Sequence, residues 1–299
     1  MKLRPVSDNP PRPGTGGLED PALPGVMQPH PVALVDAHVH IHPGIRLVEL
    51  LDAAAANFRA GARQVQLADG VPGCLMLAES AGVHRFAELA GAAESRIGRW
   101  WVHSTQEPTS LLCETEGEPV LAVVAGRQTV TAEQLEVLGW GVRTGVADGR
   151  PIEPTIEHIE RLGGVPVLPW GLGKWIGRRG RVVRDLLDRY PPGRLYVSDN
   201  GGRLRGTLLP APLRKAVARG RWNVPGSDPL PLPGQHRRAG SYGLVLRERF
   251  EPVQPLASVV AGLGRTSGQP ECYGRRSGPR QFLASQAKMQ WRKRMGGSR

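Results

Sequence analysis

Residues 34–42 constrain the fold more than any other stretch of the chain. They read Leu-Val-Asp-Ala-His-Val-His-Ile-His, so apolar residues are interleaved with Asp36 and with histidines at positions 38, 40 and 42. Such alternation predicts a β-strand, in which successive side chains point to opposite faces. His38, His40 and His42 would then share one face and converge on a divalent metal, because neutral imidazole nitrogens bind such ions at about 2.0–2.1 Å. The alternative is a surface strand that is rich in histidine by chance.

The charge balance favours an anionic partner. The chain has 39 lysine and arginine residues against 27 aspartate and glutamate residues, a formal net charge of +12. The resulting field attracts anions rather than cations. Aromatic residues make up only 5% of the chain and are not interleaved with the basic residues as in RNA-binding motifs, so nucleic acid is an unlikely partner. We expect a small anionic substrate, and an oligomer is compatible with the sequence.

Cysteine usage and hydropathy predict a cytoplasmic protein. Cys74, Cys113 and Cys272 lie far apart and form no CxxC pair, which argues against a cysteine-rich zinc site and against a disulfide framework. The first residues lack the apolar core of a signal peptide. No apolar run approaches the roughly 20 residues that span a bilayer. We therefore expect no membrane partner.

Composition divides the chain into three parts. Residues 1–31 are rich in proline and glycine without periodicity, and they predict a disordered or loosely packed leader. Residues 32–250 predict one folded domain. Residues 251–299 form a basic tail that begins as loop and ends in a docking helix at about 279–295. The stripe expected to dock that helix consists of Leu283, Ala287 and Trp291.

Strand and helix signals alternate between residues 32 and 250. The predicted strands are 32–42, 64–69, 98–103, 165–170, 195–199, 222–228 and 240–246. The predicted helices are 46–60, 77–93, 131–136, 154–162, 181–190 and 210–219. This order implies parallel strands joined by right-handed crossovers.

Polar residues stand where most of the predicted strands end, as in the active sites of (β/α)8 barrels. They are His38, His40, Asp69, His103, Lys174, Asp199 and Asp228. An open doubly wound sheet would also bind ligands at strand ends, but no GxGxxG follows the first strand. We predict an α/β fold, a TIM-like (β/α) barrel that is distorted or has reduced helices. A β-hairpin insertion over 104–130 and a C-terminal helix complete it.

Two motifs resemble those of a known superfamily. Asp-Ala-His38-Val-His40 at the end of a first strand resembles the opening motif of the amidohydrolase superfamily and is similar to the start of the related histidinol-phosphatase-like phosphoesterases. Gly-Ser-Asp228-Pro resembles the amidohydrolase closing motif. Both families are metal-dependent hydrolases built on barrels. The resemblance implies that His38 and His40 bind the metal and that Asp228 both binds it and takes a proton from the attacking water.

The chain departs from the family pattern in the middle strands, which lack the two further histidines that amidohydrolases supply. Asp199 is a candidate replacement ligand, with an Asx turn as the alternative. His103 is a candidate acid or extra ligand, with a packed histidine as the alternative. The resulting set of His38, His40, Asp199 and Asp228 suits zinc first, and also manganese, magnesium or iron.

Two glycine-rich stretches predict the substrate-binding residues. Residues 171–180 carry Lys174 and Arg178, and Asn-Gly-Gly-Arg203 has the same character. Glycines let backbone N–H groups approach an anion, and Lys and Arg side chains complete the clamp. Lys174 could also stand where the family uses a carboxylated bridging lysine, although a plain cation is the preferred interpretation.

The predicted function is a metal-dependent hydrolase in which metal-activated water cleaves an amide, ester or phosphoester bond of a small anionic substrate. Asp228 and His103 would be its catalytic residues. The alternative is a catalytically degenerate barrel that serves as a binding or scaffold protein, as the missing histidines would suggest. A third hypothesis, that the protein associates with nucleic acid, is supported only by the net charge and the basic tail.

Overall fold

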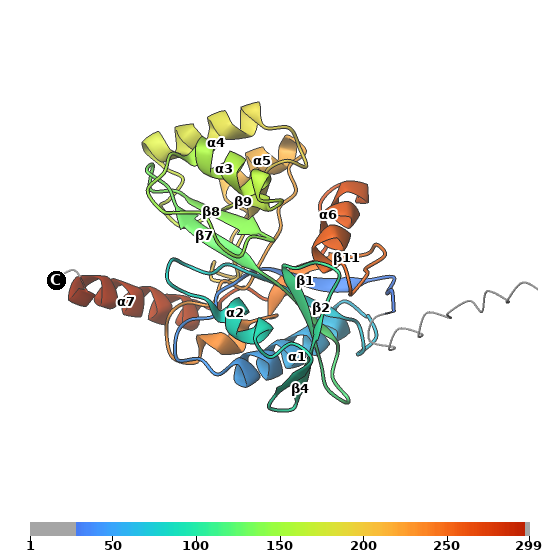
Figure 1. Cartoon of the computed structure of the whole chain (residues 1–299). Coiled ribbons are helices and arrows are strands. Elements are labelled where there is room, and N and C mark those ends of the chain that lie inside the picture. Colours follow the sequence, from blue (N-terminus) through green and yellow to red (C-terminus); the bar gives the residue numbers. More distant parts are fainter. Residues whose placement is uncertain (1–27, 297–299) are drawn as a thin grey trace, which may run out of the picture.

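The computed structural model describes residues 28–296, with side chains described as far as residue 289 (Figure 1). The leader predicted over 1–31 lies almost wholly outside the described residues. At its end, His30 exchanges backbone hydrogen bonds of 2.8 Å with Phe250.

The described strands form two sheets. The larger sheet has eight strands in the spatial order β12 (Cys272–Gly274), β11 (Tyr242–Leu246), β1 (Ala33–Val39), β2 (Gly73–Leu77), β6 (Leu121–Val124), β5 (Ser110–Glu114), β4 (Trp100–Ser104) and β3 (Ser95–Ile97). The smaller sheet has four strands in the order β10 (Tyr196–Ser198), β9 (Val165–Pro169), β8 (Glu136–Trp140) and β7 (Gly126–Val130).

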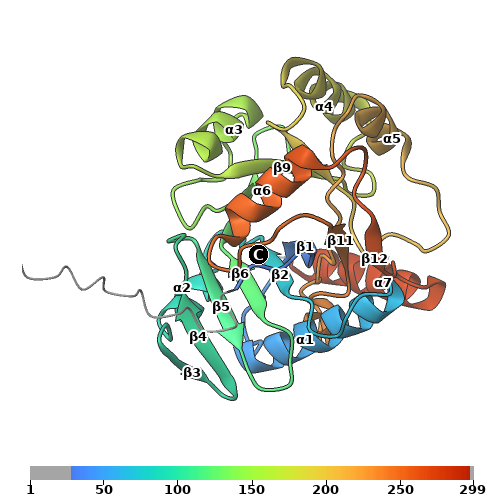
Figure 2. The same ribbon diagram turned by 90° about the vertical axis from the view of Figure 1, so that its right-hand side faces the viewer.

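Seven α-helices surround these sheets in the described part of the chain. They are α1 (Leu47–Gln64), α2 (Arg85–Ala90), α3 (Ile152–Arg161), α4 (Gly177–Arg189), α5 (Ala211–Ala218), α6 (Pro255–Arg265) and α7 (Pro279–Gly296). Helices α3, α4 and α5 cover the smaller sheet, whereas α1 lies against the larger one (Figures 1 and 2). The longest helices are not apolar enough to cross a membrane, and no other helix of residues 28–296 meets that requirement.

The predicted TIM-like barrel is wrong. Only β1–β2, β2–β6 and β9–β10 pair in parallel, and the remaining pairs within the two sheets are antiparallel. The reason lies in the connections: a parallel pair needs a crossover of a dozen or more residues, whereas only residues 115–120 join β5 to β6. The hairpin expected over 104–130 is present as β5–β6, but it belongs to the larger sheet and is not an insertion.

Several predicted elements are also wrong. The strand at 64–69 is the end of α1 and the turn after it, and the helix at 77–93 shrinks to α2. The helix at 131–136 is a turn leading into β8, and the supposed loop at 251–270 contains α6. By contrast, the helices over 46–60, 154–162, 210–219 and 279–295 and the strands over 32–42, 165–170 and 240–246 are confirmed within a few residues.

Strand β1 lies in the middle of the core. All seven of its residues are buried, with Leu34 and Val39 in the apolar cluster beneath α1 and Val35 and Ala37 in the cluster on the opposite face. A strand buried on both faces leaves no side for solvated polar groups. The carboxylate and imidazole that it carries therefore need partners inside the protein.

The segment 223–228 joins the two sheets next to β1. It was predicted as a strand, but it forms isolated parallel bridges, Val197 with Asn223 and Asn200 with Gly226. On its other side, the Ala37 N–H donates to the carbonyl of Pro225 over 3.2 Å. The segment therefore leads from β10 to the end of β1 and places residue 228 beside the histidines.

Candidate metal centre

The end of β1 brings two imidazoles together. His38 and His40 are 2% and 7% exposed, and their Nε2 atoms lie 3.0 Å apart. The two residues are two positions apart at the end of an extended strand, so their side chains point to the same side, as the alternation predicted. His42 lies beside them, with its ring stacked on that of His40 at a centroid distance of 5.4 Å.

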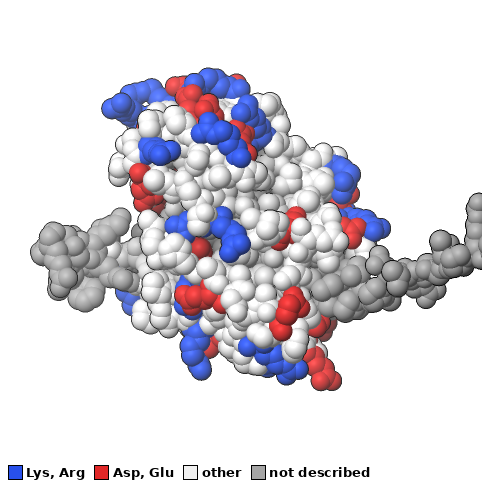
Figure 3. Space-filling model, viewed as in Figure 1, with Lys and Arg blue, Asp and Glu red and all other residues white. Residues whose placement is uncertain are grey.

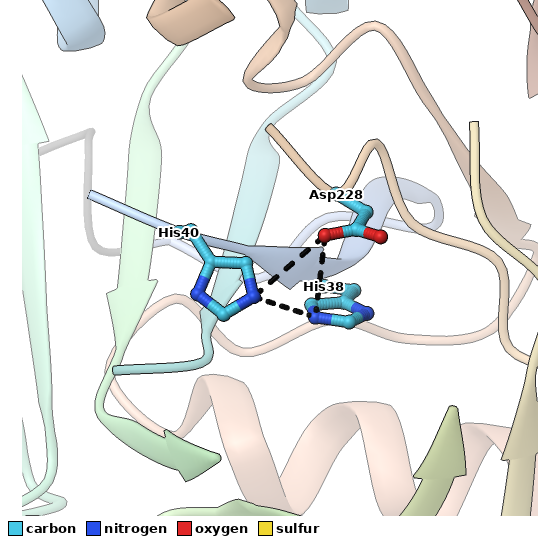
Figure 4. A group of neighbouring side chains, drawn as sticks. All are labelled: His38, His40 and Asp228. Atoms are coloured by element: carbon cyan, nitrogen blue, oxygen red, sulfur yellow. Dashed lines mark hydrogen bonds and ion pairs between the residues drawn. The ribbon is translucent and has the colours of Figure 1, made fainter. Parts of the chain in front are cut away.

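Asp228 completes the group from a distant part of the chain. Its Oδ1 atom lies 3.7 Å from the Nε2 atom of each histidine (Figure 4). Its backbone N–H donates to the carbonyl of His38 over 2.9 Å, which fixes the residue to β1. The backbone of Asp228 is left-handed, with φ of +47°, a conformation that aspartate tolerates better than most residues.

The three ligand atoms fit a transition-metal ion. A point equidistant from the corners of a triangle with edges of 3.0, 3.7 and 3.7 Å lies about 2.0 Å from each, the usual length of a Zn–N or Zn–O bond. Two imidazoles and one carboxylate are a ligand set that zinc, iron and manganese accept. Three protein ligands also leave coordination positions open, as in catalytic rather than structural zinc sites.

The electrostatics of the site favour a neutral His40 imidazole and an ionised Asp228 carboxylate. Burial, followed by the proximity of His38, lowers the pKa of His40 to about 3, so its imidazole is neutral at pH 7. Burial alone would raise the pKa of Asp228, but the neighbouring His38, His40, Lys174 and Arg238 outweigh it and lower that pKa. A neutral imidazole and an ionised carboxylate are the forms that bind a metal.

A buried carboxylate beneath the histidines supports this arrangement. Asp36 accepts hydrogen bonds of 2.8 Å from the N–H groups of Ser227 and Gly240 and a longer one of 3.3 Å from that of His38. His42 holds the residue on the other side of Asp228, because its Nε2 lies 2.8 Å from the carbonyl oxygen of Pro229. The residues on both sides of Asp228 are thus held by Asp36 of β1 and by His42, which follows β1.

His38 and Asp228 line a cavity of about 830 Å³. This volume lies within the range of about 300–1,000 Å³ that is common for small-molecule sites. The cationic side chains in its wall are Lys174, Arg179, Arg203 and Arg238. Lys174 forms an ion pair with Glu136, and Arg179 donates to the carbonyl of Gly173 over 2.9 Å.

The structure does not bring Asp199 to the metal group. Its carboxylate is 1% exposed and accepts two hydrogen bonds from Arg203, of 2.8 Å from Nε and 2.7 Å from Nη2. The third guanidinium nitrogen, Nη1, donates to the side chain and carbonyl of Thr207 and to the carbonyl of Leu208. Every nitrogen of Arg203 therefore has a protein partner, although the residue borders the cavity.

Two further predicted residues lie elsewhere. His103 is on β4, and its Nε2 lies 2.7 Å from Glu114 on the neighbouring strand. Strand β4 is four positions from β1 in the sheet, roughly 19 Å at about 4.8 Å per strand. Arg178 is exposed and does not line the cavity, whereas its neighbour Arg179 does.

The sequence analysis missed two important residues of the site. Asp36 was noted only as part of the alternation, although a carboxylate that alternation places inside a buried strand signals a need for partners. Arg238 follows Asp228 by ten positions in a proline-rich stretch without any motif, and only the folded chain places it in the cavity wall.

Comparisons with known proteins identify no family for the chain. No protein-family model matches it, and neither does any curated protein sequence. Among solved structures, it is similar to PsfC from Pseudomonas syringae PB-5123, at 16% sequence identity and a TM-score of 0.49. The alignment covers 87% of this chain and 98% of PsfC. A likeness at this level supports no conclusion about function, so the function has to be argued from the site.

Proposed function

We propose that this chain is a metal-dependent hydrolase that acts on a small anionic substrate. The observation that carries the proposal is the triangle of His38, His40 and Asp228, whose edges suit bonds of about 2.0 Å to zinc and which borders a cavity large enough for a small molecule. Zinc is the first choice of metal, and manganese or iron would fit the same ligands.

The proposed chemistry divides between the ion and the side chains. A divalent ion in the triangle would lower the pKa of a water molecule toward neutrality and polarise a carbonyl or phosphoryl oxygen. Asp228 turns its Oδ1 atom toward the histidines, so Oδ2 remains the atom that can accept a proton from the attacking water. The carboxylate would later return this proton to the leaving group.

The cationic wall supports an anionic substrate for this reaction. Lys174 and Arg238 lie near enough to Asp228 to lower its pKa, so an anion bound between them would lie beside the metal ligands. The distribution of charge on the molecular surface favours a small molecule over a nucleic acid. On the face shown in Figure 3, basic side chains are interspersed with acidic ones and do not form the continuous stripe that a phosphate backbone needs.

A cytoplasmic location is part of the proposal. All three cysteines are free thiols, with Cys74 and Cys113 buried in the core. Free thiols persist in a reducing compartment, whereas oxidising compartments favour disulfides.

Metal binding by matched variants tests the proposal. Zinc should raise the melting temperature of the wild-type protein, and elemental analysis should find metal after dialysis. His38→Ala, His40→Ala and Asp228→Asn should each weaken zinc binding by about 100-fold or more, because changes to residues that merely support metal ligands already cost about 10–100-fold. His84→Ala, which removes an exposed histidine outside the site, should bind zinc like the wild type.

Hydrolysis should follow metal content. The zinc- and manganese-loaded protein would be assayed against a panel of carboxylate esters, amides and phosphate monoesters, with Asp228→Asn as the inactive control. Wild-type metal affinity in His38→Ala would refute the ligand assignment. A metal-loaded wild-type protein that hydrolyses none of these bonds would refute the proposed activity.

A further inference from the structure

Four arginines are buried in the described part of the chain, and three of them each donate to three or more protein acceptors, although the Nε atom of Arg221 has no partner. Arg203 pairs with Asp199, as described above. Arg127 donates to two backbone carbonyls and to Glu79. Arg221 donates to three backbone carbonyls at the end of α4 and just beyond it. Such partners are needed, because burying a cation without them is costly.

The fourth, Arg238, lacks these partners. It is 8% exposed, and within the described part of the chain the only hydrogen bond of its side chain runs from Nη1 to the hydroxyl of Ser277, over 2.9 Å. Asp228 and Asp36 act on it electrostatically, but no carboxylate of residues 28–289 lies within 4.0 Å of its guanidinium group. The remaining N–H groups thus have no protein acceptor, and the residue lines the cavity beside Asp228.

The surroundings hold this guanidinium group in place. The Ser277 hydroxyl that accepts from Nη1 also donates to the carbonyl of Gly201, over 3.2 Å. A Cβ atom added at Gly201 would lie 2.9 Å from Nη2 of Arg238 and 3.1 Å from the carbonyl of Ser227. Glycine at position 201 thus lets the guanidinium group lie close to the backbone, where a larger residue would displace it. A side chain oriented in this way, with donors to spare, is built to receive an acceptor from outside the chain.

Charge and geometry define that acceptor. Glu136 neutralises Lys174 and Asp199 neutralises Arg203, whereas no described carboxylate lies within 4.0 Å of Arg179 or Arg238. Of these two unpaired cations, Arg238 is the buried one. A guanidinium group presents a planar fork of donors that matches the oxygens of a carboxylate or a phosphate. The group that binds here is therefore an oxyanion.

The remainder of the cavity defines what the oxyanion is attached to. Apolar side chains line the part formed by α7 and the loop after Arg203, namely Leu204, Leu208, Phe282 and Met289. Leu208 is 82% exposed, so covering it would gain hydrophobic stabilisation. Thr207, Ser285 and Gln286 also line this part, but its large side chains are apolar and suit a hydrocarbon group.

We propose that Arg238 binds the anionic head, a carboxylate or a phosphate, of a small amphiphilic ligand whose hydrocarbon part lies against α7. The inference rests on the proposed function only in taking this ligand to be the substrate. Binding of the anion by Arg238 requires no metal, so it can be measured on the metal-free, full-length protein.

Calorimetry and thermal shift with matched probes test the inference. Octanoate and octyl phosphate should bind and raise the melting temperature, each more than acetate or inorganic phosphate, and octyltrimethylammonium should not. The stronger of the two octyl probes identifies the head group. Arg238→Met should weaken its binding by roughly 10-fold or more, as expected from losing hydrogen bonds to a charged group, and Arg238→Lys should weaken it less.

Stability without ligand separates a binding role from a structural one. Since Arg238 is a buried cation with few partners, Arg238→Met should melt at or above the wild-type temperature. Arg221→Met, the matched change at a buried arginine that donates to three backbone carbonyls, should melt lower and bind the probe normally. An Arg238→Met protein that binds the probe normally, or that is destabilised like Arg221→Met, would overturn the inference, as would a wild-type protein that binds no octyl probe.

Experiments can refute the proposed hydrolase activity and the proposed binding by Arg238 independently of each other. His38→Ala in the metal-free state should keep the binding that depends on Arg238, although it cannot bind zinc normally. A wild-type protein that binds octyl probes through Arg238 but hydrolyses nothing would leave the inference standing and refute the proposed activity. Equal binding of octanoate and acetate, or of octyl phosphate and inorganic phosphate, would refute the hydrocarbon part.

Discussion

Asp199→Asn should destabilise the protein strongly and leave its metal binding unchanged. In the wild type, Oδ1 and Oδ2 of Asp199 accept from Nε and Nη2 of Arg203 over 2.8 and 2.7 Å, and the two side chains are 1% and 8% exposed. Asparagine has the same shape but replaces one oxygen by an NH2 group. A donor would then face a donor, and the buried charge of Arg203 would lose its counter-ion.

The size of the effect follows from this geometry. Breaking a buried ion pair by removing one partner costs about 3–5 kcal/mol. The lower end applies here, because the asparagine oxygen can still accept from Nε and because Nη1 keeps its acceptors at Thr207 and Leu208. At about 2–4 °C per kcal/mol for a domain of this size, a loss of about 3 kcal/mol lowers the melting temperature by roughly 6–12 °C.

Scanning calorimetry measures the stability, and competition with a zinc chelator measures the affinity for metal. The double variant Asp199→Asn/Arg203→Met serves as the control, because removing both charges should recover part of the loss and reveal their coupling. If Asp199→Asn melted like the wild type and bound zinc more weakly, Asp199 would be a metal ligand and its assignment to an ion pair would be refuted.

Three further predictions concern the metal-free protein and its surface. Burial raises the pKa of Asp36 to about 7, from 3.8, so its favourable contribution is present below pH 3.8 and lost as the pH rises through 7. As the pH rises from 4 to 7, the free energy of unfolding of the wild type, measured in urea, should therefore fall by about 4 kcal/mol relative to that of Asp36→Asn. The pKa of His40 is shifted the other way, to about 3 from 6.5, so its contribution is present above pH 6.5. It is lost as the pH falls toward 3, and His40→Gln should flatten the acid limb of the same titration. Leu283→Ser should change stability by less than about 0.5 kcal/mol, since Leu283 is 66% exposed, and a large drop in melting temperature would contradict this.

The core of the candidate site could be predicted because it depends on local geometry. Alternation along a strand is enough to put His38 and His40 on one side, whatever the strand pairs with. Asp228 was found through the motif around it. Its position depends on the segment before it, which bridges β1 and β10 and is not the regular strand that was predicted. The structure therefore brings His38, His40 and Asp228 together as predicted, although Asp199 and His103 lie elsewhere and the segment that delivers Asp228 is not a regular strand.

The global fold could not be predicted because local patterns compete and tertiary packing decides between them. Val65-Gln66-Leu67 alternates like a strand, yet α1 runs on through Gly61 to Gln64. At Gly61, a Cβ atom would lie 2.5 Å from the ring of Tyr273, so the contact of α1 with β12 depends on glycine at this position. Likewise, α6 is rich in glycine and valine, which are poor helix formers, and burial of Val259 and Leu263 overrides that preference.

Tertiary packing also decides which face of α7 contacts the rest of the protein, and the predicted face is wrong. Spacing by four selected Leu283, Ala287 and Trp291 as the docking stripe, but Leu283 and Ala287 are exposed. The face that meets the body carries Phe282, Ser285 and other residues that line the cavity. Both faces have apolar residues, so the pattern alone could not choose between them. In the structure, the face of α7 that packs against the protein is the one that lines the cavity.

One buried group connects the proposed metal ligands with Arg238, the arginine proposed to bind the anion. Asp36 accepts from the N–H of Ser227, which precedes Asp228, and from that of Gly240, which follows Arg238 by two positions. It also accepts from the N–H of His38. The two segments that enter the cavity from the C-terminal half are therefore held by the strand that supplies the histidines. Burial of an acidic group normally carries a cost in stability, and the presence of Asp36 here is explained if its carboxylate aligns the proposed metal ligands with the proposed anion site.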